Sequence, residues 1–469
     1  MKFVAIAITT ALAAASDNAA LQVWSSFGSD PLSSLTISFA SAAPCATPAL
    51  NIGTAPSTLA PSPVTADPPF FFNNNQGLAY YYRARLTGLA PGTRFYYQVA
   101  ACGAWSRVFS VSTLPASPNL TFILTGDMGR DDGEQILPQL LHEAELAQQG
   151  GADAASMFVI AGDFAYDLHD EEGGRGASFM QRLSNVSAFI PTQMTIGNQF
   201  VHIRSPACRP LLIPSLNHAR THPPPPTPNS EQASGNASHY TNILGKGLPS
   251  NNFGHWYSLT TGLIHWVFLS SEVYHMAPFD ILLPSGPFTI SAPAQRAWLA
   301  ADLAAVDRAA TPWLIAVYHR PFYCSNADSD ECSSIPLQWP TNPLRVDLEP
   351  LFMAHGVDLC VEAHEHSVEI IYPLVNGKVT NKSFVAPQAP VHFVTGTAGC
   401  NEDSESCQNP ILLPSDFTAD YMWGPFQYSY TRLRAMNSTV LHLEQVKVLP
   451  TPSIWRAIDI VQPSHGPFA

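Results

Sequence analysis

After residue 120, this sequence runs five times from a short apolar segment directly into a cluster of polar residues. The apolar segments have the length and composition of buried β-strands, and they are 121–125, 157–161, 194–196, 314–317 and 357–361. The clusters that follow them are Gly126-Asp127-Met128-Gly129, Gly162-Asp163-Phe164-Ala165-Tyr166, Gly197-Asn198, Val317-Tyr318-His319 and Ala363-His364-Glu365-His366. Folds of the α/β class place their chemistry at the carboxyl ends of strands. We therefore predict that the clusters lie at the carboxyl edge of a sheet.

The clusters supply the side-chain types that bind hard or intermediate metal ions. Carboxylates, an amide oxygen and imidazoles come from Asp127, Asp163, Asn198, His319, His364 and His366. A carboxylate can bridge two cations. His364 and His366 are two residues apart, so on an extended segment they point the same way and each can serve a different ion of a pair.

Tyr166 suggests which metal one of the two sites would hold. It follows Asp163 by three residues, so one loop could bring both side chains to the same ion. A phenolate ligand requires a strongly Lewis-acidic ion, which favours ferric iron over zinc or magnesium. Two neighbouring metal ions can orient a phosphate, polarise its oxygens and lower the pKa of a bound water. A metal-bound hydroxide would then attack phosphorus, with no serine or cysteine nucleophile required.

Each cluster alone has a simpler explanation. A Gly-Asp pair after a strand usually forms a turn, a single histidine or tyrosine is more often a core residue, and a His-x-His pair is weak evidence of a metal. Five such clusters in this order, all after strands, favour a dinuclear metal site over those alternatives.

Length and charge set further bounds. A chain of 469 residues exceeds what a single core usually holds, so we expect two domains. The formal net charge of -14 argues against a nucleic-acid partner. It does not exclude a phosphate substrate, because bound metal ions can be the largest local positive charges.

The amino terminus predicts export. Lys2, the apolar run 3–12 and Ala13-Ala14-Ala15 together resemble a signal peptide over residues 1–16, with a buried strand as the alternative. No later stretch is long and apolar enough to span a bilayer. Five glycosylation sequons support a secreted or extracellular location, with the vacuole or lysosome as alternatives, and they begin at Asn119, Asn185, Asn236, Asn381 and Asn437.

Eight cysteines in an exported chain of this length predict a few local disulfides. The pairs that we favour are Cys45–Cys102, Cys324–Cys332 and Cys400–Cys407.

Two parts of the chain differ in pattern. In residues 21–113, apolar and polar side chains alternate within short stretches that are separated by turn residues, which predicts an all-β domain. Within this domain, the turn-rich segment 86–97 resembles the corner of a fibronectin type III sandwich. Beyond residue 120 strands alternate with helices, predicted over 134–149, 292–309 and 344–355. Residues 201–234 are aperiodic and contain four consecutive prolines, which predicts a disordered insertion.

Together the motifs resemble those of the purple acid phosphatases, a family of calcineurin-like metallophosphoesterases. The family pattern GDxG, GDxxY, GNH(E/D), VxxH, GHxH appears here as GDMG, GDFAY, GNQF, VYHR and AHEH. The resemblance covers nearly the whole chain, including the segment 390–469. It implies a fibronectin-like domain over 17–115 and an α/β catalytic domain over 119–469, built as a β-sandwich with flanking helices and carrying the insertion near 200–235.

The resemblance also implies a division of the ligands between two metals. The ferric site would use Asp127, Asp163, Tyr166 and His366. The divalent site, holding Fe, Zn or Mn, would use Asp163 as a bridge together with Asn198, His319 and His364. Asp163, Asn198 and Arg320 are the candidate catalytic residues, and Arg320 and Tyr323 are expected to face the substrate, with a surface ion pair as the alternative for Arg320.

Two residues depart from the family pattern. Ala363 replaces a glycine, which we expect to have a small effect. Gln199 replaces a histidine that contacts phosphate or assists the leaving group, and glutamine cannot act as a general acid. Residues 199–230 interrupt a motif that one histidine before Glu231 would restore, so we hypothesise that they are a translated intron, a gene-model error or a recent insertion.

The sequence therefore predicts a secreted, two-domain acid phosphatase acting on a small phosphate monoester. Two alternatives remain: a secreted binding or structural protein that lost turnover through Gln199, and a phosphodiesterase on the same scaffold.

Overall fold

The structure is a computed structural model. It describes residues 20–68, 70–71, 78–117, 119–151, 153–166, 168, 171–197, 238–250, 252–275, 290–325, 342–399, 417–422 and 427–468. Several predictions fall outside these residues: the signal peptide, Asn198, Gln199, the insertion, and the cysteines at 332, 400 and 407.

The amino-terminal domain is all β, as predicted. One sheet has the order β1-β2-β7-β5, with β6 also on β7, and its strands are β1 (Leu21–Phe27), β2 (Leu35–Ser41), β7 (Leu78–Leu86), β5 (Thr65–Ala66) and β6 (Phe70–Phe71). The other has the order β10-β8-β3-β4, with β9 on β8, and consists of β10 (Phe109–Ser112), β8 (Arg94–Ala101), β3 (Ala49–Gly53), β4 (Ala60–Ser62) and β9 (Ala104–Trp105).

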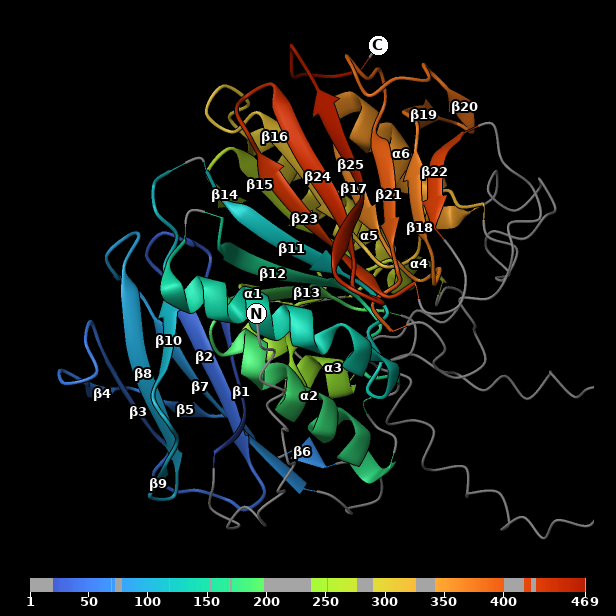
Figure 1. Ribbon diagram of the computed structural model, residues 1–469. Helices are drawn as coiled ribbons and strands as arrows, with labels where there is room; N and C mark the ends of the chain where they lie inside the picture. The colour runs from blue at the N-terminus through green and yellow to red at the C-terminus, as the bar shows by residue number, and fades with distance from the viewer. Residues whose placement is uncertain are drawn as a thin grey trace, which may run out of the picture.

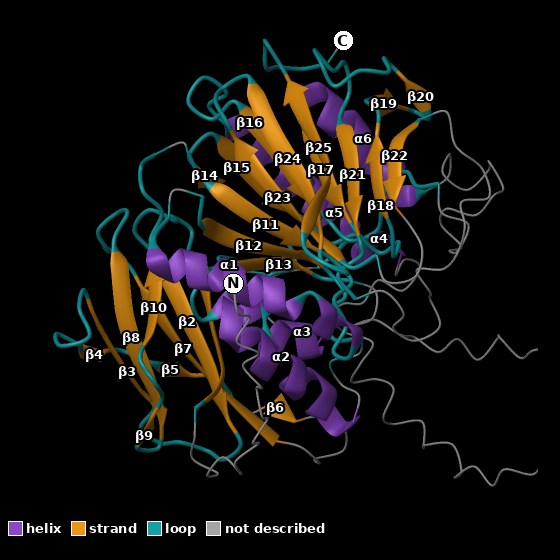
Figure 2. Ribbon diagram, in the orientation of Figure 1, coloured by secondary structure: helices purple, strands orange, loops and turns teal. Residues whose placement is uncertain are grey.

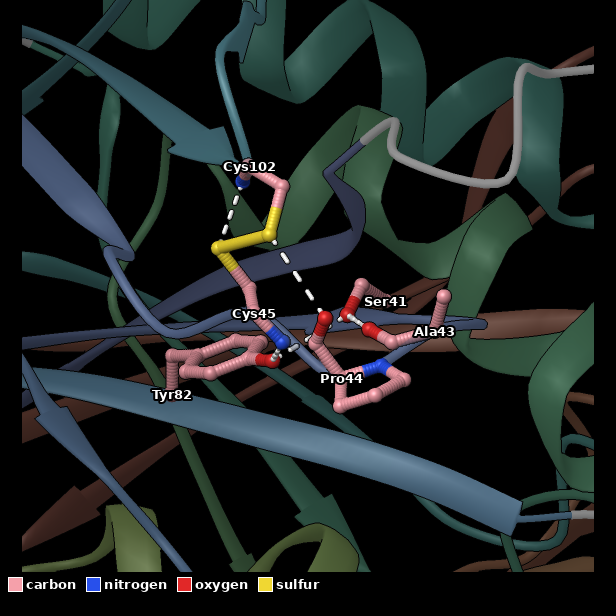
Figure 3. Close-up of a disulfide and its surroundings, with 6 residues drawn as sticks. All are labelled: Ser41, Ala43, Pro44, Cys45, Tyr82 and Cys102. Carbon is pink, nitrogen blue, oxygen red and sulfur yellow. Dashed lines mark hydrogen bonds between the residues drawn. A yellow bond between two sulfur atoms is a disulfide. The ribbon is translucent and has the colours of Figure 1, made fainter.

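A disulfide cross-links two segments of this domain. Cys45 and Cys102 are bonded with their Cα atoms 5.2 Å apart, which confirms the predicted pair (Figure 3). The Tyr82 hydroxyl accepts a hydrogen bond of 2.9 Å from the Cys45 backbone N–H. Cys324 is also disulfide-bonded.

Two mixed sheets form the centre of the second domain (Figure 2). The six-stranded sheet runs β13-β12-β11-β23-β24-β25, with β13 (Thr192–Thr195), β12 (Ala155–Ala161), β11 (Thr121–Thr125), β23 (Ser429–Ala435), β24 (Val440–Lys447) and β25 (Ser453–Val461). The seven-stranded sheet runs β14-β15-β16-β17-β21-β18-β22, with β14 (Tyr257–Thr261), β15 (Ile264–Phe268), β16 (Trp313–Val317), β17 (Leu359–Glu362), β21 (Val391–Thr395), β18 (Val368–Ile371) and β22 (Thr418–Met422). A small hairpin joins β19 (Leu374–Val375) to β20 (Lys378–Val379).

The strands that precede the candidate ligands are parallel within each sheet. β11, β12 and β13 run parallel, as do β15, β16, β17 and β21. Their carboxyl ends therefore lie at one edge of each sheet. The five predicted strands are confirmed, because each apolar run forms or overlaps one of these strands.

Apolar side chains join the two sheets and hold the helices against them. Between the sheets, Phe122 of β11 meets Trp266 of β15 at a ring separation of 5.0 Å. Helices α1 (Leu137–Gln149) and α2 (Gly174–Ser187) lie on the six-stranded side, toward the amino-terminal domain (Figure 1). Helices α5 (Ala292–Ala305) and α6 (Pro343–His355) cover the other face of the seven-stranded sheet. The shorter helices are α3 (Ser238–Ile243) and α4 (Glu272–His275).

Buried hydrogen bonds fix the two domains together. The Ser25 hydroxyl on β1 donates to the carbonyl of Ser187 at 2.7 Å, and the Tyr97 hydroxyl donates to the carbonyl of Ala188 at 2.7 Å. The core is continuous across this boundary, since Phe27, Phe39 and Tyr97 belong to the same apolar cluster as the sheet residues. The amino-terminal domain thus packs directly against the domain that carries the site.

Candidate metal centre

Six of the seven predicted ligands meet where the carboxyl edges of the two sheets face each other. The loops after β11 and β12 bring Asp127, Asp163 and Tyr166, and the loops after β16 and β17 bring His319, His364 and His366. All six side chains are buried, the most exposed being His364 at 7%. Asn198, the seventh, follows β13 but lies outside the described residues.

One group of donor atoms surrounds Asp163. Its Oδ2 lies 3.1 Å from Nε2 of His319. Ligand atoms of Asp163, His319 and His364 all lie within 4.8 Å of one another. This spacing is what a single ion needs for three side chains to bind it together.

A second group surrounds Asp127. Its Oδ1 lies 3.3 Å from the Tyr166 hydroxyl and 3.8 Å from Nε2 of His366. The Tyr166 hydroxyl is also hydrogen-bonded to His366. The two groups adjoin, because His319 Nε2 lies 4.0 Å from Asp127 Oδ1. The described donors thus form two adjoining groups, Asp163 with His319 and His364, and Asp127 with Tyr166 and His366.

The backbone is strained at these ligands. Four of the six have a left-handed conformation, with φ of 55° at Asp127, 43° at Asp163, 48° at Tyr166 and 72° at His364. Non-glycine residues adopt this region at a cost, and such residues concentrate at functional sites. The tight turns direct the donors inward from the strand ends.

Hydrogen bonds orient two of the ligands. Nδ1 of His319 is bonded to the carbonyl of Ala161 at 2.8 Å, which leaves Nε2 facing Asp163. The backbone N–H of His364 donates to Oδ2 of Asp127 at 2.7 Å, so each sheet fixes a ligand of the other.

The electrostatics favour a cation between the carboxylates. Burial lowers the pKa of His319, but the carboxylates of Asp163 and Asp127 outweigh it and raise that pKa to about 9. Burial and the neighbouring Arg320 and His319 hold the pKa of His364 well below its ordinary value. The pocket thus draws positive charge to its carboxylates while keeping His364 a neutral imidazole, the form that binds metals.

Arg320 lies at the edge of the ligand cluster. Its Nη1 is 3.4 Å from Nε2 of His364, and its Nε donates to both oxygens of Glu272 at 2.9 and 3.1 Å. Its backbone N–H donates to Ser271 Oγ at 3.1 Å. Glu272 was not predicted as a site residue, although it too follows a strand, β15, by a few residues.

Comparisons with known proteins show which family the chain belongs to. Residues 20–113 match the family model described as purple acid phosphatase, N-terminal domain, and residues 389–451 match that of the iron/zinc purple acid phosphatase-like protein C. The chain is 31% identical to acid phosphatase type 7 of Danio rerio over 408 residues, covering 83% of this chain and 79% of that protein. This chain belongs to the purple acid phosphatase family.

Other relatives extend the match. Acid phosphatase type 7 of Homo sapiens is 31% identical over 399 residues, covering 82% of this chain and 78% of that protein. A purple acid phosphatase from yellow lupin seeds has a similar fold, with a TM-score of 0.71 at 17% identity, over 95% of this chain and 75% of that one. The chain is accordingly a hydrolase of the acid phosphatase family, and the family implies a dinuclear metal centre. Among the described residues no helix is both long and apolar enough to cross a membrane.

The structure also places Ala363 and Tyr323, two residues near the ligands. The methyl group of Ala363, which replaces the family glycine, faces Gly126: a Cβ added to Gly126 would lie 2.3 Å from it. The expectation that Tyr323 faces the substrate is wrong. Tyr323 is 1% exposed, and its hydroxyl donates to Glu349 and accepts from the Gly377 backbone, because the loop turns that ring into the core beside α6.

Proposed function

We propose that this purple acid phosphatase hydrolyses phosphate monoesters at a dinuclear centre of ferric iron and a divalent ion, Fe, Zn or Mn. The observation that supports it is the convergence of two carboxylates, three imidazoles and a phenol in one buried space. Such a donor set is suited to two cations, because it offers both hard oxygen and imidazole ligands around a shared carboxylate.

The proposed assignment follows the two groups of donors. Asp127, Asp163, Tyr166 and His366 would hold the ferric ion. Asp163, Asn198, His319 and His364 would hold the divalent ion. When bound, the two ions would orient the phosphate, offset its developing charge and activate a water for in-line attack.

The protein supplies orientation and charge around that centre. The bifurcated hydrogen bond from Nε of Arg320 to both oxygens of Glu272 holds the guanidinium beside His364, where it can bind a phosphate oxygen of the substrate. Arg320 is then the residue that recognises the ester's charge.

We also propose that the protein is secreted and glycosylated. The predicted signal peptide and the five sequons support this. Asn119, Asn185 and Asn437 are exposed, as glycosylation requires.

The test compares esters. Metal-loaded protein should release phosphate from an aryl phosphate monoester at least tenfold faster than it cleaves the matching diester, with an acidic optimum. Faster diester cleavage would indicate a phosphodiesterase. Absence of turnover on both, with metals bound, would instead support a binding protein disabled at Gln199.

A further inference from the structure

A second cluster of polar side chains lies within the seven-stranded sheet, next to the strand ends that carry two of the ligands. Oε1 of Glu362 accepts three hydrogen bonds: from the Tyr318 hydroxyl at 2.5 Å, from the Phe322 backbone N–H at 3.0 Å and from Nδ1 of His392 at 3.0 Å. Cys360 is close to both Glu362 and His392. These residues are at most 1% exposed.

The partners of Glu362 flank the residues proposed to bind the divalent ion. Tyr318 directly precedes His319, and Phe322 follows it in the same loop. Glu362 itself lies two residues before His364. One carboxylate oxygen therefore links the loop after β16 to the end of β17, the two segments that must hold His319 and His364 at a fixed separation. His392 extends the link to β21.

Cys360, Glu362 and His392 have the side-chain types of a zinc site, but their geometry differs from one. Glu362 Oε1 and His392 Nδ1 are hydrogen-bonded directly to each other, and the same oxygen already holds two further donors. An ion bound to these two atoms would have to lie between groups that now bind one another. The cluster is thus a complete hydrogen-bond network around Oε1.

A buried network of this kind is weak evidence for a stabilising role. A buried ion pair has a desolvation cost that often exceeds its attraction, and apolar residues of similar volume serve a core as well. Oε2 of Glu362 has no hydrogen-bond partner among the described residues, which adds to that cost. Burial lowers the pKa of His392, but Glu362 and Cys360 outweigh it and raise that pKa well above its ordinary value.

We propose that Glu362 is a positioning residue that fixes the spacing of His319 and His364 and so selectively supports the divalent half of the metal centre. The ferric half takes three of its four proposed ligands, Asp127, Asp163 and Tyr166, from the six-stranded sheet and only His366 from the loop after β17. It therefore depends less on this link. The inference rests on the proposed dinuclear function.

The experiment measures each metal separately in Glu362→Gln. Glutamine has the same shape but loses the charge, and its amide cannot accept all three hydrogen bonds as well. We expect the apparent Kd of the divalent ion, measured by competition with a chelator, to rise about 10-fold, the usual range for residues that orient metal ligands. The ferric ion and its visible absorption band should stay at wild-type levels.

A milder variant and a matched control sharpen the test. Tyr318→Phe removes only the hydroxyl at 2.5 Å and should weaken divalent binding in the same direction even if Glu362→Gln does not fold. Glu143→Gln is the control: Glu143 is a buried carboxylate that accepts from the Tyr430 hydroxyl at 2.8 Å on the six-stranded sheet, and it should leave both metals unchanged.

The outcomes separate the possible explanations. Parallel loss of both metals, or unchanged divalent affinity in both variants, would overturn the inference. So would a third equivalent of metal in the wild type that Glu362→Gln removes, because the cluster would then be a metal site. A wild type that binds no divalent ion would refute the proposed function and this inference with it; normal wild-type binding with unaltered variants would refute the inference alone.

Discussion

At the scale of single residues, the site combines ligands that their motifs identify with neighbours that no motif marks. The six described ligands were predicted because their types are distinctive and each follows an apolar run. Glu272 and Glu362 were not predicted, since an isolated glutamate in a sequence carries no sign of its partner. Tyr323 was misplaced for a related reason: the sequence does not specify which side of a loop faces the core.

The role of Arg320 gives a prediction at this scale. Glu272 holds the guanidinium through both carboxylate oxygens, so Glu272→Gln should leave Arg320 mobile. We expect KM for a phosphate monoester to rise about tenfold, the effect of losing about 1.4 kcal/mol of binding free energy, with smaller changes in kcat. Metal content should not change. A loss of metal, or an unaltered KM, would show that the pair does not orient Arg320 for substrate.

At the scale of elements, the strands were predicted accurately because burial on both faces makes them apolar throughout. Helix ends were less accurate. The α5 helix ends at Ala305 rather than at the predicted 309, because Val306 leaves the helix with an extended ψ of 124°. The α1 helix begins at Leu137, next to Pro138, after a separate 3₁₀ turn over Asp132–Gln135. Local backbone geometry of this kind has only a weak signal in the pattern of apolar residues.

The junction after β13 gives the prediction for an element. A Cβ on Gly197 would lie 2.1 Å from Oδ1 of Asp163, so the strand end must be glycine for the proposed bridging ligand to keep its place. Gly197→Ala should reduce the affinity for both metals, by about 10-fold or more.

The control for that variant is Gly151→Ala. No atom outside its chain neighbours lies within 4 Å of a Cβ at Gly151, and it should retain wild-type metal content. Equal metal content in the two variants would mean that the glycine after β13 is not needed to keep the Asp163 side chain in place.

At the scale of the whole molecule, the two-domain fold was predicted from the change in pattern near residue 115, and the all-β and α/β parts are confirmed. The buried contacts between the domains were not predicted. The Ser25 and Tyr97 hydroxyls donate hydrogen bonds to backbone carbonyls at the end of α2. These residues are far apart in the sequence, and no local sequence pattern predicts such contacts.

The insertion gives a prediction for the whole chain. Replacing residues 199–230 by one histidine restores the family motif before Glu231 and supplies a group that can contact phosphate or donate a proton. Turnover of a phosphate monoester should rise, by about 10²-fold if general acid catalysis is regained. Metal content should be unchanged. A folded deletion variant that is no more active would refute the hypothesis that these residues impair the site.

The central claim is that Tyr166 binds ferric iron in a dinuclear centre. The most direct measurement is the visible absorption spectrum of the purified wild type and of Tyr166→Phe, recorded together with the iron and divalent metal content of each. We predict that the wild type contains iron with a second metal and shows a charge-transfer band in the visible, and that the variant loses the band. An iron-loaded but colourless wild type, or a band that persists in Tyr166→Phe, would contradict the account.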